Sequence, residues 1–342
     1  MSSPTPNPIS SDDLPPVQPP SAGFLVQLFL VPGIIVAIIV VVWILVDWLA
    51  HMESDPQKYV EGLSRNTPDV WQKAENLAEM LRNDRGNQLK GDAKLAAKLA
   101  EILNEKIDTG LMDEGSINLR VYLSSALGQF NTPEGLPALL KAASTHRDPS
   151  ELPVRRSALD AIGMLISNLQ STAGRTGKAE LPDGEKLLSA LLEAARDPEP
   201  VIRLRAAFVL GIVGDDRSTS RLEKMLDDPY PDVAYNAATA LARHGDPRAI
   251  DTLLEMLDPR QSKALEKEDP AMQAEKRSII FVNGLRAIGQ LADADPSADL
   301  SRVAPAVDHL RDAGFPLEVR DAAMAAHDKL QKRGHTAGSA AR

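Results

Sequence analysis

The chain has 342 residues, of which 43% are apolar and only 4% aromatic, and its formal net charge is −10. Ala and Leu supply most of the apolar residues, which suits close helix–helix packing better than a β-sandwich or barrel. The absence of cysteine excludes disulfides, thiolate nucleophiles, Cys-ligated zinc and iron–sulfur clusters, and the acidic average disfavours a nucleic-acid binder, which needs a basic face.

The first segment, residues 1–23, contains seven prolines and no Lys or Arg. A segment of this composition buries too little apolar surface to offset the entropy lost on ordering. We therefore expect a disordered, partly polyproline-like tail. Pro16-Val17-Gln18-Pro19 matches the PxxP pattern, but a solvated spacer is the simpler interpretation in a Pro-rich tract.

The most apolar stretch follows this tail. Phe24 to Val46 contains no charged residue, and at ~1.5 Å per residue such a helix would be ~35 Å long, enough to cross a ~30 Å hydrocarbon core. Ile34 to Val42 is apolar without interruption, which leaves no amphipathic face. A cleaved signal peptide would need a cationic start and a small-residue cleavage site, and the sequence has neither. The sequence thus predicts one uncleaved transmembrane helix over residues 24–50.

The distribution of cations indicates the orientation of this predicted helix. No Lys or Arg precedes it, whereas Lys58 and Arg65 follow it, and cationic flanks favour the cytoplasmic side. We therefore expect a single-pass membrane protein whose large domain is cytoplasmic and whose N-terminal tail lies on the opposite side.

The remaining chain has helical periodicity. Apolar residues recur three and four positions apart at Trp71, Ala74, Leu77, Ala78 and Leu81. No stretch shows the sustained alternation with β-branched residues that strands need. The sequence therefore predicts an all-α fold after the apolar stretch.

One sequence unit is repeated in the middle of the chain, with a shift of 31 residues between the two copies. The first copy consists of Asp197-Pro198, Ile202-Arg203, Ala206-Ala207, Leu210-Gly211 and Gly214-Asp215, and the second of Asp228, Val233, Ala237-Ala238, Leu241-Ala242 and Gly245-Asp246. More divergent copies begin near Leu119, Val154, Ile280 and Val319. Self-similarity at a period of about 20–50 residues is typical of stacked repeats, in which no unit can bury its apolar face alone.

These repeated residues, with Gly245-Asp246-Pro247-Arg248-Ala249-Ile250, resemble the HEAT family, and more closely the short HEAT-like repeats first associated with phycobilin lyases. Together with the apolar stretch, the pattern is similar to membrane-anchored bacterial HEAT-repeat proteins. The resemblance implies an α-solenoid over residues 55–331, with about six helix pairs in a right-handed superhelix and the second helix of each pair on the concave side. Residues 332–342 are polar and small, and we expect a flexible C-terminal tail there.

Two features of the repeat predict specific contacts. Asp197 and Asp228 are placed to accept hydrogen bonds from free N–H groups at the start of the next helix. Arg155 and Arg203, one turn into their helices, are placed to pair with the Asp of a neighbouring turn, which would give a ladder along the stack. The sequence also predicts two surface insertions between repeats, from Gln170 to Gly184 and from Arg260 to Arg277.

The sequence offers no motif for chemistry. Six histidines are present, none within four residues of another, and there is no HExxH, GxxxxGK[ST] or GxSxG motif. His244 precedes Gly245 at a predicted helix end, where a cap is a better interpretation than a metal ligand. We therefore expect no catalytic residue, no cofactor and no metal, and predict that the chain is not an enzyme.

Three functions remain open on these grounds. The first is a membrane-anchored, non-catalytic scaffold or adaptor that binds one or more proteins, with no nucleic acid and no small-molecule substrate as partner. The alternatives are an enzyme or enzyme accessory of the HEAT-like lyase type, and a HEAT-like nucleic-acid binder. The residues expected to contact a protein partner are Arg155, Arg203, Arg205, Tyr235, Asn236 and Arg243. A purely structural role in the ladder is the alternative for the arginines.

Overall fold

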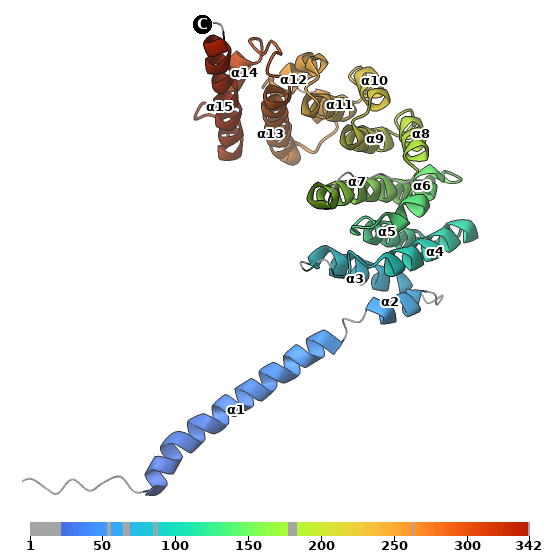
Figure 1. Ribbon diagram of the computed structural model, residues 1–342, viewed down its shortest axis with the longest axis vertical. Coiled ribbons are helices and arrows are strands. Elements are labelled where there is room, and N and C mark those ends of the chain that lie inside the picture. The colour runs from blue at the N-terminus through green and yellow to red at the C-terminus, as the bar shows by residue number, and fades with distance from the viewer. Residues whose placement is uncertain are drawn as a thin grey trace, which may run out of the picture. The chain divides into compact units, whose positions relative to one another are not determined.

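The computed structural model describes residues 22–52, 56–63, 69–84, 86, 88–176, 183–261 and 263–340. Within these ranges every regular element is a helix, which confirms the predicted all-α fold. The predicted Pro-rich tail lies outside the described residues as far as residue 21. The chain divides into two compact units, Met1–Asp55 and Pro56–Arg342, and Figure 1 shows the helices of each.

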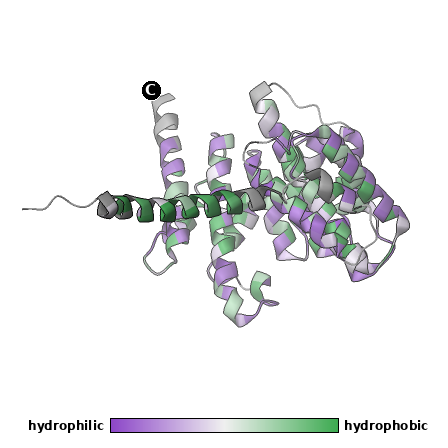
Figure 2. Ribbon diagram, turned by 90° about the horizontal axis from the view of Figure 1, so that it is seen from below, coloured by the Kyte–Doolittle hydropathy of each residue, from purple (hydrophilic) through white to green (hydrophobic). Residues whose placement is uncertain are grey.

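The first unit contains helix α1, Ala22–Met52, with Pro32 inside it. Apolar residues follow one another along this helix (Figure 2), and its described side chains are exposed. Among the described residues, no helix combines the length and apolarity needed to cross a bilayer. This finding corrects the predicted transmembrane helix over 24–50, together with the single-pass membrane localisation and orientation drawn from it.

Fourteen α-helices form the described part of the second unit. They are α2 (Pro56–Leu63), α3 (Val70–Asn83), α4 (Ala93–Thr109), α5 (Glu114–Leu127), α6 (Leu136–Ser144), α7 (Leu152–Thr176), α8 (Gly184–Ala194), α9 (Pro200–Val213), α10 (Asp216–Met225), α11 (Pro231–Arg243), α12 (Ile250–Leu257), α13 (Pro270–Ala294), α14 (Ala304–His309) and α15 (Leu317–Ala340). Short 3₁₀ helices at Pro133–Gly135, Pro149–Glu151, Pro247–Ala249 and Lys263–Leu265 lead into α6, α7, α12 and α13.

These helices form two rows. Each even-numbered helix packs on the odd-numbered helix that follows it, and the odd-numbered helices from α3 to α15 pack on one another in chain order. In the described part of the second unit this gives seven helix pairs. The odd-numbered helices lie on the inner side of the curve that this unit follows (Figure 1), as expected for the second helix of each pair.

The core lies between the two rows and is built largely from Leu and small residues. Ala206 and Ala207 of α9 and Ala237 and Ala238 of α11 are fully buried. A Cβ atom added to Gly211 would lie only 2.5 Å from Cβ of Ala240 on the next inner helix. Small residues therefore allow successive inner helices to approach closely, and stacking buries the apolar face that one pair leaves open.

The turns that join one helix pair to the next show why the repeated unit carries Gly and Asp. Gly214 ends α9 with φ +66°, a left-handed conformation that favours glycine. The adjacent Asp215 then accepts a hydrogen bond from the backbone N–H of Ser218 at 2.7 Å and caps α10. The Gly-Asp dipeptide thus ends one helix and begins the next.

The two predicted insertions contain more helix than the sequence indicates. Helix α7 continues to Thr176, and within this extension Gln170 donates to the carbonyl of Ile212 and Thr172 to the carbonyl of Asn168. Residues 177–182 lie outside the described residues. The charged stretch after Arg260 forms a short connection, and its second half is the first part of α13. Prediction from high polarity alone therefore made both loops longer than they are in the structure.

Candidate functional site

The structure divides the six candidate residues into two groups. Arg155 and Arg203 lie near the beginning of α7 and α9, where both are buried. The other four line a single groove on the inner side of the stack, and they are Arg205, Tyr235, Asn236 and Arg243.

Arg203 is held by four hydrogen bonds. Its Nε and Nη2 atoms donate to the two carboxylate oxygens of Asp228 at 2.7 and 2.9 Å. Its Nη1 atom donates to the carbonyls of Asp197 and Pro198 at 2.8 and 3.1 Å. Burial raises the pKa of Asp228, but the hydrogen bonds from Arg203 outweigh burial and hold that pKa below its ordinary value. The pair therefore joins the α8–α9 turn to the α10–α11 turn as a charged, bidentate contact.

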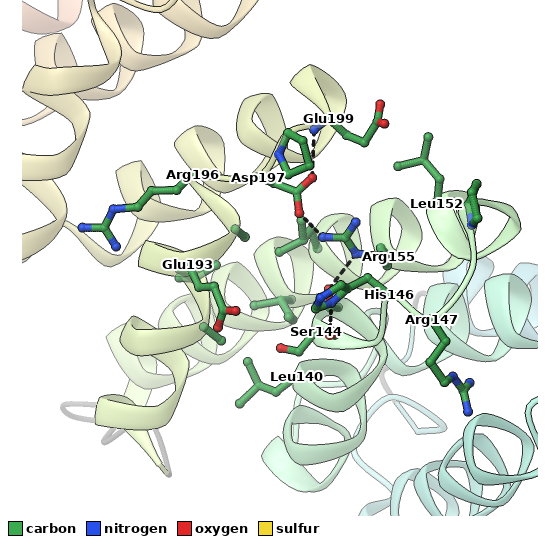
Figure 3. Close-up of a pocket in the computed structure, with 18 of the residues that line it drawn as sticks. Leu140, Ser144, His146, Arg147, Leu152, Arg155, Glu193, Arg196, Asp197 and Glu199 are labelled. Carbon is green, nitrogen blue, oxygen red and sulfur yellow. Dashed lines mark hydrogen bonds and ion pairs between the residues drawn. The ribbon is translucent and has the colours of Figure 1, made fainter.

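Arg155 makes the equivalent contact one repeat earlier (Figure 3). Its Nη2 atom forms an ion pair with Asp197, and its Nε atom donates to the carbonyl of Ala143 at 3.3 Å. Asp197 also accepts from the backbone N–H of Glu199 at 2.9 Å. Because Asp197 contacts both Arg155 and Arg203, the two pairs form one continuous series, and the predicted ladder is confirmed.

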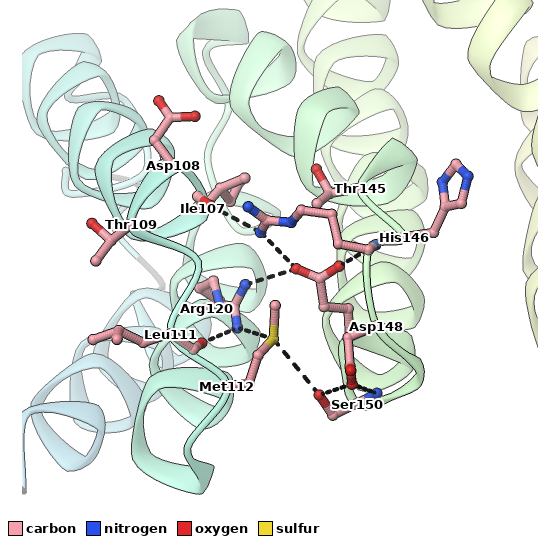
Figure 4. A network of polar contacts seen from close by, with 12 residues as sticks. Ile107, Asp108, Thr109, Leu111, Met112, Arg120, Thr145, His146, Asp148 and Ser150 are labelled. Carbon is pink, nitrogen blue, oxygen red and sulfur yellow. Dashed lines mark hydrogen bonds and ion pairs between the residues drawn. The ribbon is translucent and has the colours of Figure 1, made fainter.

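The sequence analysis missed a third buried pair, between Arg120 and Glu151 (Figure 4). Each side chain is only 1% exposed, and Nη1 of Arg120 lies 3.2 Å from Oε1 of Glu151. Arg147 reaches the same carboxylate with its Nη2 atom at 2.6 Å and its backbone N–H at 2.8 Å. Burial raises the pKa of Glu151, but the hydrogen bonds from Arg147 hold it below its ordinary value.

A sequence signal for Arg120 was available. Arg120 follows Leu119 as Arg203 follows Ile202 in the repeated unit. The partner of Arg120 could not be predicted from the repeat. The residue equivalent to Asp197 and Asp228 is Asp148, which instead accepts a hydrogen bond from the backbone N–H of Ser150 at 2.8 Å. The contacts of the buried arginines favour a structural role, since their donors are used inside the stack.

The inner groove, as we call the groove that holds the other four candidates, lies over α9, α11 and α13 and has a volume of about 460 Å³. Its floor is one face of α11, which presents Asp232, Asn236, Thr239 and Arg243. These positions are four, three and four residues apart, the spacing that places side chains on one side of a helix.

Bulky apolar side chains border this floor. Phe208 of α9 is 41% exposed and Ile279 of α13 is 52% exposed, and both line the inner groove. Apolar side chains exposed beside polar ones in a recess are the arrangement found at binding surfaces.

Two of the predicted residues, Tyr235 and Asn236, line the groove while their side chains form hydrogen bonds within the protein. Tyr235 is buried, and its hydroxyl lies 3.2 Å from Oε1 of Glu255 and accepts a hydrogen bond from Gln261. Burial raises the pKa of the Tyr235 phenol well above its ordinary value. Asn236 donates to the carbonyl of Asp232 at 2.9 Å. These residues therefore shape the floor, while Phe208 and Ile279, which the sequence analysis did not select, present the exposed apolar surface.

A second opening lies between α6, α7 and α8, with a volume of about 560 Å³ (Figure 3). Its interior is apolar, with Leu159, Ile162 and Leu191 at its base, and His146 and Arg196 lie at its rim. Much of its charged wall is the Arg155–Asp197 pair, whose groups are already satisfied within the stack. Among the described residues, no group of three or more His, Cys, Asp or Glu side chains could hold a metal ion.

The fold and its turn contacts define the chain as an α-solenoid of helix pairs, a class of helical repeat protein. Family models agree: a model of HEAT repeats matches residues 188–272, and a model of the PBS lyase HEAT-like repeat matches residues 119–145. These matches identify HEAT-type repeats in residues 119–145 and 188–272 of the chain. No curated protein matches its sequence.

Solved structures with a similar fold include Escherichia coli YibA, an engineered protein and human deoxyhypusine hydroxylase in complex with glycerol. YibA is 17% identical over 81% of this chain and 92% of its own, with a TM-score of 0.43. The engineered protein is 18% identical over 82% and 98%, with a TM-score of 0.35. The hydroxylase is 17% identical over 81% and 96%, with a TM-score of 0.32.

The prediction that the chain is not an enzyme is corrected by this comparison. One of the similar structures carries the name of a hydroxylase. A fold does not by itself decide function, and the lack of a recognised motif does not exclude an enzyme. At these TM-scores and identities, none of the three structures assigns an activity or a partner to this chain.

Proposed function

We propose that this HEAT-repeat protein binds a partner protein, and that the inner groove over α9, α11 and α13 is the binding surface. The observation that carries the proposal is the combination of exposed Phe208 and Ile279 with polar side chains in one recess. Binding sites on proteins combine apolar anchors with a few polar groups that fix orientation.

The construction of the stack supports this choice of surface. The buried Arg–carboxylate pairs fix the turns between paired helices, and close packing fixes the inner helices relative to one another. A groove on such a support needs little reordering when a partner binds, which reduces the entropic cost of association.

Site-specific photo-cross-linking tests the proposal. We expect a photoreactive phenylalanine analogue at Phe208 or Ile279 of the full chain to form adducts with another protein in the source cells. The matched control is the same analogue at Leu111, an apolar side chain that is 53% exposed and does not line the inner groove. Equal adduct yields at Phe208, Ile279 and Leu111, or no adducts at the two groove positions, would refute the proposal.

A further inference from the structure

The inner groove is positively charged although the whole chain carries a net charge of −10. Its lining has one carboxylate, that of Asp232, and four cations, which are Arg205, Arg243, Lys276 and Arg286. A local excess of one sign in a recess raises the concentration of ligands of the opposite sign there.

Partners within the protein neutralise two of these four cations. Nε of Arg205 lies 3.0 Å from Oδ1 of Asp160 on α7. Nζ of Lys276 lies 2.9 Å from Oδ2 of Asp232 and 2.8 Å from Oε1 of Glu268. These two cations already have the carboxylates that a ligand would otherwise supply.

Arg243 and Arg286 form no ion pair with a carboxylate among the described residues, and both side chains reach the surface. Arg286 also lines a neighbouring opening with Glu318 and Asp321. Nη1 of Arg243 makes one long contact, 3.5 Å, with the carbonyl of Gly211. Partial burial of its guanidinium lowers the pKa of Arg243, and no carboxylate acts to raise it. A guanidinium presents several donors in a planar fork that matches a carboxylate, so both side chains have donors to offer a ligand.

We infer that the inner groove selects an acidic protein segment in which a large apolar side chain is flanked by Asp or Glu residues; this inference rests on the proposed function. The apolar side chain packs between Phe208 and Ile279, and the flanking carboxylates pair with Arg243 and Arg286. The two arginines lie on neighbouring inner helices, α11 and α13, that line the same groove.

A nucleic acid is the other polyanion that such a groove could attract, and the structure favours the protein segment. Nucleic-acid affinity comes largely from a track of cations that neutralises many phosphates. Here two of the four cations are already paired, the lining includes the carboxylate of Asp232, and exposed Phe208 and Ile279 offer aliphatic and aromatic contact.

A random peptide library displayed on phage and selected against the full chain tests the inference. We expect the enriched sequences to share a Leu, Ile, Met or Phe with Asp or Glu within a few positions on either side. One synthetic enriched peptide, labelled with fluorescein, then provides an affinity by fluorescence anisotropy. Phe208→Ala should weaken this affinity about 30-fold, the effect of losing an interface hot spot.

Charge reversal gives the test of specificity. Arg243→Glu and Arg286→Glu should each weaken the affinity for the acidic peptide about 10-fold or more. The double variant should bind more tightly to a peptide in which Lys replaces the acidic residues. Lys224→Glu, at an exposed position of α10 outside the groove lining, makes the same change of charge and is the matched control, which should leave the affinity unchanged. Circular dichroism of each variant checks that the helices are retained.

The outcomes separate the inference from the proposed function. If enriched peptides lack acids but still lose affinity with Phe208→Ala, the inference is wrong and the proposed function stands. If Phe208→Ala and both arginine reversals leave peptide affinity unchanged, the proposed function also fails. Tighter binding of a single-stranded oligonucleotide than of any peptide, abolished by Arg243→Glu, would overturn both.

Discussion

Replacing Arg203 by Ala tests whether the buried ladder holds the stack together. The substitution removes two hydrogen bonds to Asp228 and two to backbone carbonyls, and it leaves Asp228, whose side chain is only 8% exposed, without its cation. Breaking one member of a buried pair costs about 3–5 kcal/mol. Since Arg203 retains slight solvent contact, we expect a loss near the lower end, about 3 kcal/mol, a large share of a typical total stability of ~5–15 kcal/mol.

Urea unfolding of the full chain, followed by far-ultraviolet circular dichroism, measures this loss as a change in unfolding free energy. Arg260→Ala is the control, because Arg260 pairs with Asp258 but is 90% exposed, and we expect no measurable change. The double variant Arg203→Ala, Asp228→Ala should be more stable than the sum of the single effects implies, by ~1–3 kcal/mol of coupling. A loss for Arg203→Ala no larger than for Arg260→Ala would refute the reasoning.

Three further predictions concern stability and use the same unfolding assay. Glu151→Gln leaves buried Arg120 without a full counter-charge and should cost about 3 kcal/mol; a neutral effect would mean that the pair does not contribute. Gly128→Ala would place its Cβ 2.7 Å from the backbone of the next inner helix and should lower the unfolding free energy by ~1–3 kcal/mol. The control Gly174→Ala meets nothing within 4 Å and should stabilise α7 by ~0.5–1 kcal/mol. Equal effects of the two substitutions would contradict the close approach at Gly128. The hydrogen bonds from Arg203 hold the pKa of Asp228 below its ordinary value despite burial. The stabilisation by ionised Asp228 is therefore present above its unfolded-state pKa and is lost as the pH falls through the lowered pKa. Asp228→Asn should make stability less dependent on pH in the acid range, and an unchanged acid slope would contradict the assignment.

The sequence was informative wherever a contact repeats with the period of the unit. Aligned copies identified the Arg at the start of the second helix, and the structure places Arg155 and Arg203 on the predicted turn carboxylates. The sequence analysis made no prediction for Arg120, whose partner Glu151 replaces the repeated Asp and stands three residues further along. A periodic pattern therefore predicts a ladder, while a local change of partner requires coordinates.

The inner groove could be predicted only in part. Arg205 and Arg243 were selected because they lie on predicted inner helices, and both line the groove. Phe208 and Ile279 were not selected, since an apolar residue in an amphipathic helix is expected in the core and periodicity does not reveal which ones remain exposed. Ion pairing was also hidden, because Asp160 reaches Arg205 from another helix.

The most direct test of the binding surface is photo-affinity mapping with a selected peptide whose apolar residue is replaced by a diazirine-containing analogue. We predict that mass spectrometry will place the adducts on α9, α11 and α13 of the full chain, centred on Phe208 and Ile279, and that Arg243→Glu will reduce their yield. Adducts located instead at the opening between α6, α7 and α8, around Leu159 and Leu191, would contradict the assignment of the inner groove as the binding surface.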